Sequence, residues 1–424
     1  MNIFTKYKKI FWIIGFIAIT ILLGFLLYKF FFQGTGSLIS GVSKTATTTP
    51  GGLPSSETGN GQISTSTGNG MIPGNENIAS GTSGTAVSTQ PDANTPSETA
   101  LGGLTSVETL TTSPVLGSTS SNSGGVQYYN KDDGYFYKIG ADGKAVKMSD
   151  RIFHDVKSIT WAPSKTKAIL EYPDGTKILY DFSTKKQTNF PSYWEDFSFS
   201  PQSDQLIAKS IALDPNNRFL TVSSDDGSNV TNVEEIGTNA DKVQTSWSPN
   251  NQIVATYTKG TDLNREEVYF VGLNGENFKS TTVEGRGLNY IWSTTGDRLL
   301  YSVYNTTSDM KPLLWIVDAA GDNISENRQS LSVNTWADKC TFANNTQIYC
   351  AVPTNLQSGS GVIRAVADND SDELYKIDLE TGVKTLVAVP DGSFNAENLT
   401  VDKNQTQLTF SDKNTGLLYR VKLK

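Results

Sequence analysis

Three carboxylates at alternate positions form the most distinctive polar segment of this 424-residue chain. Asp368, Asp370 and Asp372 stand in the run Asp-Asn-Asp-Ser-Asp-Glu. Oxygen ligands at this spacing suit Ca²⁺, but an EF-hand loop needs Gly at its sixth position, where this run has Glu373. A solvated acidic loop is therefore the preferred interpretation, and a Ca²⁺ site at these three carboxylates is the alternative. The sequence predicts no other metal and no cofactor.

The two cysteines, Cys340 and Cys350, suit a disulfide across a hairpin. If the chain turns around Asn344-Asn345-Thr346, Cys340 lies opposite Cys350, and Phe342 lies opposite Ile348. Directly opposed antiparallel residues have Cα atoms about 4.5–5.5 Å apart, which a disulfide tolerates. We therefore predict a structural disulfide, with two buried free thiols as the alternative.

Serine-type hydrolysis would have to use His154, because it is the single histidine of the chain. No Gly-x-Ser-x-Gly motif accompanies it, and Gly359-Ser360-Gly361 is typical of a flexible turn. Zinc sites usually need about three or four Cys or His ligands. We therefore predict a loop histidine and no catalytic residue.

A charge-free apolar run occupies residues 10–28, after a short tail of residues 1–9 that carries three lysines. A helix of about 20 residues crosses a bilayer, and the lysines favour a cytoplasmic N-terminus. We predict a retained signal-anchor that spans the cell membrane once and leaves the rest of the chain outside the cytoplasm. A cleaved signal peptide is the alternative, although its apolar core is usually about 7–15 residues long.

Residues 29–125 are rich in Ser, Thr and Gly and poor in aromatic residues. Such a segment buries too little apolar surface to offset its ordering entropy, so we predict a disordered linker. Residues 126–424 form the predicted folded domain, which carries a net charge of −8. Because nucleic-acid binding depends on Lys and Arg contacts to phosphate, this acidic domain is not expected to bind nucleic acid.

A strand, a tight turn and a second strand recur through residues 126–424, and the copy that starts at Trp247 is the best preserved. Successive copies are 38, 48, 45, 50 and 59 residues apart and start at Trp161, Phe199, Trp247, Trp292, Phe342 and Val401. That spacing is typical of four-stranded propeller blades. We predict an all-β propeller in which the five aromatic residues of these copies pack between blades.

A second signature, an apolar strand followed by a polar turn, occurs seven times. The first signature thus predicts six blades and the second predicts seven. In a seven-bladed ring, residues 126–139 and 408–421 would each belong to an incomplete blade. In a six-bladed ring, the N-terminal strands would complete the last blade. Seven blades are favoured.

The motifs Trp-Ser-Pro-Asn-Asn at Trp247, Phe-Ser-Pro-Gln-Ser at Phe199 and Trp-Ala-Pro-Ser-Lys at Trp161 resemble the Trp-Ser-Pro-Asp-Gly repeat of TolB-like and WD-like β-propellers. The same repeat occurs in the non-catalytic propellers of prolyl-oligopeptidase-type enzymes. No copy keeps the full Asp-Gly pair, and the last two lose both Trp and Pro. The resemblance implies an extracytoplasmic, protein-binding propeller and assigns no binding residue.

Function is expected in segments that differ between the copies, such as residues 354–373. Trp194 lies outside the repeat register and is a candidate for an exposed contact with a partner. The leading hypothesis is a membrane-tethered, extracytoplasmic β-propeller that binds a protein or a cell-wall polymer without catalysis. The alternative is a propeller hydrolase whose carboxylates converge at the central funnel.

Overall fold

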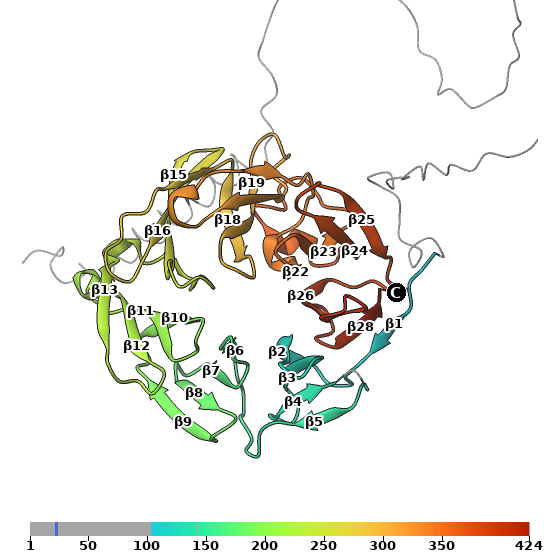
Figure 1. The fold of residues 1–424 in the computed structure, drawn as a ribbon, viewed down its shortest axis with the longest axis horizontal. Helices are drawn as coiled ribbons and strands as arrows, with labels where there is room; N and C mark the ends of the chain where they lie inside the picture. The colour runs from blue at the N-terminus through green and yellow to red at the C-terminus, as the bar shows by residue number, and fades with distance from the viewer. Residues whose placement is uncertain (1–21, 24–102, 141, 424) are drawn as a thin grey trace, which may run out of the picture. The chain divides into compact units, whose positions relative to one another are not determined.

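The computed structural model describes residues 22–23, 103–140 and 142–423. Within them, 28 strands form seven antiparallel sheets of four strands each, arranged as blades around a ring (Figure 1). The fold is a seven-bladed β-propeller, which confirms the predicted all-β class and the favoured blade number.

Consecutive strands make up blades 1 to 6. Blade 1 consists of β2 (Val115–Ser120), β3 (Val126–Asn130), β4 (Phe136–Ile139) and β5 (Ala145–Lys147). Blade 2 consists of β6 (Ser158–Trp161), β7 (Lys167–Glu171), β8 (Lys177–Asp181) and β9 (Lys186–Phe190). Blade 3 consists of β10 (Trp194–Phe199), β11 (Gln205–Ser210), β12 (Phe219–Ser224) and β13 (Thr231–Glu235).

The remaining blades follow the same order until the last. Blade 4 consists of β14 (Val243–Thr245), β15 (Ala255–Asp262), β16 (Arg265–Val271) and β17 (Thr281–Val283). Blade 5 consists of β18 (Arg286–Trp292), β19 (Arg298–Tyr304), β20 (Leu313–Asp318) and β21 (Gln329–Ser330). Blade 6 consists of β22 (Cys340–Asn344), β23 (Gln347–Pro353), β24 (Asp372–Asp378) and β25 (Lys384–Ala388). Blade 7 consists of β26 (Ala396–Val401), β27 (Gln407–Asp412), β28 (Leu418–Lys422) and β1 (Val107–Thr109).

Short 3₁₀ turns lie between the strands in the described residues: η1 (Pro215–Asn217), η2 (Gly237–Asn239), η3 (Gly321–Asn323), η4 (Ala337–Lys339) and η5 (Arg364–Ala367). No helix in residues 22–23, 103–140 and 142–423 is long and apolar enough to span a bilayer. The predicted tail 1–9, nearly all of the predicted span 10–28 and residues 29–102 of the predicted linker lie outside the described residues.

The ring closes through β1, which lies beside β28 and pairs Val107 with Val421 and Thr109 with Tyr419 (Figure 1). The folded region therefore starts before Val107 and not at the predicted residue 126. Blades 1 and 7 are both complete, so neither predicted closure is correct. The error has a physical cause, because the three-residue β1 and the six-residue β2 lie in a Ser-, Thr- and Gly-rich stretch that composition assigns to the linker.

Neighbouring blades pack face to face, which explains the uninterrupted apolar middle strands. Leu206, Ile207 and Ala208 of β11 are all fully buried, since other blades cover both faces of the sheet. The aromatic residues of the repeat lie in or against these clusters between blades: Phe199 and Trp247 are buried, and Trp161, Trp292 and Phe342 are half-buried.

The repeated turn is held together by its own side chains. The Ser248 hydroxyl accepts hydrogen bonds from the backbone N–H groups of Gln252 and Ile253, at 3.2 and 2.9 Å. Trp247 donates its indole N–H to Asn251, which has a left-handed backbone with φ of 63°. Asn tolerates this conformation better than most residues, which explains its place in the motif.

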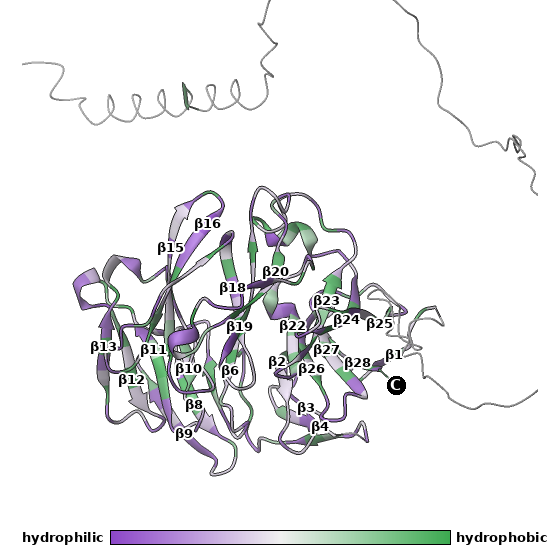
Figure 2. Cartoon of the chain, turned by 45° about the horizontal axis from the view of Figure 1, so that its top comes forward, coloured by the Kyte–Doolittle hydropathy of each residue, from purple (hydrophilic) through white to green (hydrophobic). Residues whose placement is uncertain are grey.

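Antiparallel strands give the ring two distinct faces. The first-to-second and third-to-fourth turns of each blade lie on one face, called here the turn face. The second-to-third loops and the connections between blades lie on the other, called the loop face. Figure 2 shows that the hairpin of β15 and β16 on the loop face is largely hydrophilic.

Candidate functional site

Residues 354–371, which join β23 to β24, form the longest second-to-third-strand loop in the described part of the chain. We call this segment the blade 6 loop. At its base, the backbone N–H and the hydroxyl of Thr354 both donate to the carbonyl of Ser371, at 2.9 and 3.1 Å. These two hydrogen bonds therefore close the base of the loop, as in a hairpin.

The first half of the blade 6 loop is bonded to blade 5. Gly359 N–H donates to the Asp309 carbonyl at 3.1 Å, and Gly361 N–H donates to the Met310 carbonyl at 2.8 Å. A Cβ atom at Gly361 would lie 2.5 Å from Cβ of Tyr304, so only glycine allows this approach.

The second half of the blade 6 loop is bonded to blade 7. The side-chain amide of Asn395 donates to the carbonyls of Ala367 and Asp368, at 3.2 and 3.0 Å. Lys413 forms an ion pair of 2.6 Å with the Asp368 carboxylate. The loop is thus held by the blades on both sides of blade 6.

Arg364, in η5, fixes the middle of the loop. Its guanidinium lies 4.8 Å from the centre of the Trp336 ring, a cation–π contact. The same group donates to Asp338 at 2.6 Å and lies 3.9 Å from a Glu397 oxygen.

A buried ion pair lies at the base of the loop. Lys339 and Asp372 are 2.8 Å apart, and their side chains are 3% and 1% exposed. Lys339 also donates to Asn395 at 2.6 Å, and Asp372 accepts from the Ala396 N–H at 2.6 Å. Burial raises the pKa of the Asp372 carboxyl, and the adjacent Lys339 ammonium opposes that rise.

Three branched apolar side chains of the same loop face solvent. Val362, Ile363 and Val366 are 56%, 60% and 42% exposed. They follow the Gly359-Ser360-Gly361 segment, which the sequence suggested as a flexible turn, although the structure bonds that segment to blade 5. The loop therefore presents an apolar patch, defined by these three residues, on a backbone that is held in place.

The structure does not bring the three candidate calcium ligands together. Asp368 pairs with Lys413, whereas Asp372 is buried against Lys339. Within residues 103–140 and 142–423, no three His, Cys, Asp or Glu side chains are grouped so that they could hold a metal ion.

Cys340 and Cys350 lie opposite each other on β22 and β23 and form a disulfide with a Cα–Cα distance of 4.0 Å. His154 is exposed in the connection between blades 1 and 2. The prediction of an exposed contact at Trp194 is wrong, because this residue starts β10, is 4% exposed and stacks on Phe190 with ring centres 5.6 Å apart.

The innermost strands of the described ring carry three carboxylates: Glu195 and Asp196 of β10 and Glu397 of β26, of which Glu195 is exposed. Asp196 of β10 accepts from the Thr245 N–H at 2.9 Å and pairs with Lys209 at 3.2 Å. Glu397 of β26 lies beside Arg364. Asp196 and Glu397 thus each have a cationic neighbour.

The loop face continues from the blade 6 loop toward blade 4. Thr306 N–H donates to the Asn264 side chain at 2.9 Å, which joins the second-to-third loops of blades 4 and 5. Beside this contact lies an open hollow of about 580 Å³, lined in part by Leu263, Glu284 and Trp315.

No protein-family model matches the chain, and no curated protein matches its sequence. Similarity to solved structures extends over the ring. The β-propeller domain of Cps50 (Swd1) from Myceliophteria thermophila is 12% identical with a TM-score of 0.51, and the match covers 75% of this chain and 100% of that one.

An oligogalacturonate lyase in complex with manganese is also 12% identical, with a TM-score of 0.49 and coverage of 76% of this chain and 98% of that one. The oligogalacturonate lyase from Vibrio parahaemolyticus is 8% identical, with a TM-score of 0.47 and coverage of 75% and 93%. At these identities, what this chain shares with the solved structures is the fold alone.

Proposed function

We propose that this protein is a membrane-tethered, extracytoplasmic β-propeller that acts as a non-catalytic binding module for a protein partner. One observation carries the proposal. The apolar patch of Val362, Ile363 and Val366 is exposed, while the loop that bears it is hydrogen-bonded to blades 5 and 7. Exposed apolar side chains that gather on one loop are typical of protein contacts.

The energetics favour a protein partner at this patch. Fully burying an exposed Val or Ile side chain contributes about 1.5–3 kcal/mol, and because these three are 42–60% exposed, burying the rest of each contributes roughly half of that. Ordering a flexible side chain on binding costs about 0.5–1.5 kcal/mol. Because Val and Ile have few rotamers and the loop backbone is already held, most of this cost is avoided here.

The proposed location rests on the apolar run of residues 10–28 and on the Cys340–Cys350 disulfide. Disulfides persist outside the cytoplasm, where thiols are not kept reduced. The Ser-, Thr- and Gly-rich stretch between residue 29 and β1 has the composition of a flexible tether, which would allow the ring to reach a partner away from the membrane.

Site-specific photo-crosslinking in the full-length chain tests the proposal. A crosslinking residue is placed at Ile363, and a matched control is placed at Leu213, which is fully exposed on the loop face of blade 3. We expect a discrete protein adduct at position 363 and none at position 213. The substitutions Val362→Ser and Val366→Ser should reduce the adduct about tenfold or more.

Equal adducts at both positions, or none at position 363, would contradict the proposal. The full chain could instead bind isolated cell wall. If the triple variant Val362→Ser, Ile363→Ser, Val366→Ser loses that binding, the partner at this patch is a wall polymer and not a protein. Turnover of a glycan or peptide library that is lost in Asp196→Asn or Glu397→Gln would favour the hydrolase.

A further inference from the structure

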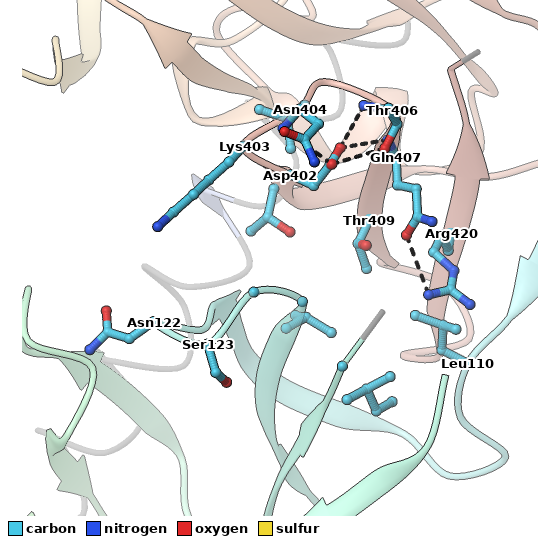
Figure 3. Close-up of a pocket in the computed structure, with 17 residues that line it drawn as sticks. Leu110, Asn122, Ser123, Asp402, Lys403, Asn404, Thr406, Gln407, Thr409 and Arg420 are labelled. Carbon is cyan, nitrogen blue, oxygen red and sulfur yellow. Dashed lines mark hydrogen bonds between the residues drawn. The ribbon is translucent and has the colours of Figure 1, made fainter. Parts of the chain in front are cut away.

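A cavity of about 400 Å³ lies on the turn face, between the last blade and the first (Figure 3). Blade 7 contributes its first-to-second turn, residues 402–406, and part of β27 and β28. Blade 1 contributes its own first-to-second turn, residues 121–125, and the ends of β3 and β4. The turn face lies opposite the blade 6 loop, so this cavity is separate from the proposed binding patch.

The first-to-second turns of blades 7 and 1 are not bonded to each other beside this cavity, although Val115 N–H of β2 donates to the Gly416 carbonyl of blade 7 at 2.8 Å on the loop face. At the six other junctions, a hydrogen bond joins an innermost strand, the turn after it or the start of the second strand to the neighbouring blade. The bonded pairs are Lys165–Thr119, Ser164–Ser203, Trp247–Ser198, Asn250–Gly296, Thr294–Asn345 and Gln405–Gln347. Between blades 7 and 1, no hydrogen bond joins residues 402–406 to residues 121–125 in the part of the chain that is described.

The first-to-second turn of blade 1 has glycine at its left-handed position, as the turn of blade 5 does at Gly296. Lys165 and Gln405 occupy the left-handed position of their turns, with φ of 58° and 52°, and reach back to the preceding blade. Gly124 has a φ of 83° in the corresponding turn of blade 1 and no side chain. A Cβ atom there would meet nothing within 4 Å, so the space remains open.

The lining combines an apolar side with a polar mouth. Leu110, Val126 and Ile139 supply the apolar side. Figure 3 shows Lys403 extending into the opening from blade 7, with Asn122 and Ser123 across from it on blade 1. A ligand here would meet apolar atoms inside and polar groups at the mouth, where the Asn122 amide already donates to the Ser164 carbonyl and the Ser123 hydroxyl is bonded to Ser121.

The other charged groups of the lining are already engaged. Arg420 binds both carboxylate oxygens of Glu108, at 2.9–3.0 Å. Asp402 accepts from the N–H groups of Thr406 and Gln407, both at 2.6 Å. Although burial acts to raise it, the pKa of the Asp402 carboxyl lies below its usual range because of these hydrogen bonds.

Lys403 differs from these groups, since it is exposed and forms no ion pair within the described residues. The available charge at the mouth is therefore positive. We propose that the cavity binds a small carboxylic acid with a short apolar body. Its carboxylate lies at Lys403 beside Asn122 and Ser123, and its body packs on Leu110, next to the buried Val126 and Ile139. A free acid and the C-terminus of a peptide share this chemistry.

Ligand-observed NMR titrations of the full-length chain test this site. The probes are hexanoate, hexanamide, and an Ala-Val-Ala tripeptide with a free or an amidated C-terminus. We expect saturable binding of hexanoate or of the free tripeptide, and at least about fivefold weaker binding of the matching amide, because a charged hydrogen bond is lost. If hexanoate binds more tightly, the natural ligand is a free acid. If the free tripeptide binds more tightly, the ligand is the C-terminus of a peptide chain.

Two variants act on the site independently. Lys403→Met should weaken binding at least about fivefold, with Lys131→Met, an exposed lysine on the loop face, as its control. Gly124→Gln should fill the gap as Gln405 does between blades 6 and 7, and should abolish binding. Gly275→Gln is its control, because Gly275 also has a positive φ and open space around it.

Binding of the amides as tight as that of the acids, unchanged affinity in Lys403→Met, or no saturable binding to the wild-type chain would each overturn the proposal. The loop-face variants that remove Val362, Ile363 and Val366 should keep full affinity for the acid. Failure of this site is therefore distinguishable from failure of the proposed function.

Discussion

The side chain of Arg364 connects three parts of the loop face that are separate in the sequence. It packs on Trp336, donates to Asp338 and approaches Glu397 of blade 7. Its guanidinium is one-third exposed, so the individual ion pairs are screened by solvent and contribute little alone. The guanidinium contacts the Trp336 ring and two carboxylates at once, which the single ammonium of a lysine would not reproduce.

Replacement of Arg364 should therefore loosen the loop without unfolding the ring. In Arg364→Ala, we expect amide hydrogen exchange in residues 359–368 to become about tenfold faster, while the strands of blade 6 keep their protection. Arg364→Lys should behave similarly. Lys311→Ala is the control, because Lys311 has a single ion pair of 3.7 Å with Asp309 on the same face. Equal exchange in all variants would show that Arg364 does not hold the loop.

At the scale of elements, the polar link under the blade 6 loop joins η4, β24 and the start of β26. Lys339 and Asp372 are charged and buried, so each depends on the other to offset its loss of hydration. Asn395 and the Ala396 N–H complete the link from blade 7. This network sets the position of the loop relative to both blades.

Removing one partner of this pair should be costly. Asp372→Ala leaves Lys339 buried and unpaired, which should lower the free energy of unfolding by about 3–5 kcal/mol. Lys339→Met combined with Asp372→Leu removes both charges and should recover part of that loss. Denaturant midpoints of the full-length chain measure both effects. A double variant no more stable than Asp372→Ala would contradict this account.

Short sequence motifs correctly predicted the repeated turns and strands, but they did not predict the elements that occur once. The turn at Trp247 could be read from the sequence because Ser248, Asn251 and Ile253 satisfy it within a few residues. The register that places Cys340 opposite Cys350 could be counted for the same reason. Trp194 could not be placed, because its neighbour Phe190 belongs to the blade before.

The candidate sites were less accessible to sequence reasoning. The variable loop at residues 354–373 could be singled out, but its rigidity depends on Asn395 and Asp309, which lie in other blades. The cavity between blades 7 and 1 needs Gly124 and Lys403 to be neighbours, although they come from the first and the last blade. Only the closed ring brings them together.

At the scale of the whole molecule, both ends of the folded region contribute to one sheet. The β1 strand is the outer strand of blade 7, and β2 is the innermost strand of blade 1. A fragment that starts at residue 126 therefore lacks one strand from each of the two blades that close the ring.

Truncation tests the importance of this closure. We expect residues 103–424 to unfold cooperatively and residues 126–424 to be insoluble or to melt at least about 10 °C lower, because exposed strand edges and core are left unpaired. Differential scanning calorimetry compares the two. Identical melting of both fragments would show that β1 and β2 are dispensable for the ring.

The pairing of β1 with β28 also has a consequence during synthesis. β1 is the first strand of the ring to leave the ribosome and β28 is the last, so β1 waits roughly 15 to 60 seconds for its partner at about 5–20 residues per second. An unpaired strand is a template for aggregation throughout that time. The three-residue length of β1 and the charge of Glu108 limit this hazard, and the same carboxylate later binds Arg420. Glu108 thus limits aggregation of the nascent chain and later joins β1 to β28 in the closed ring.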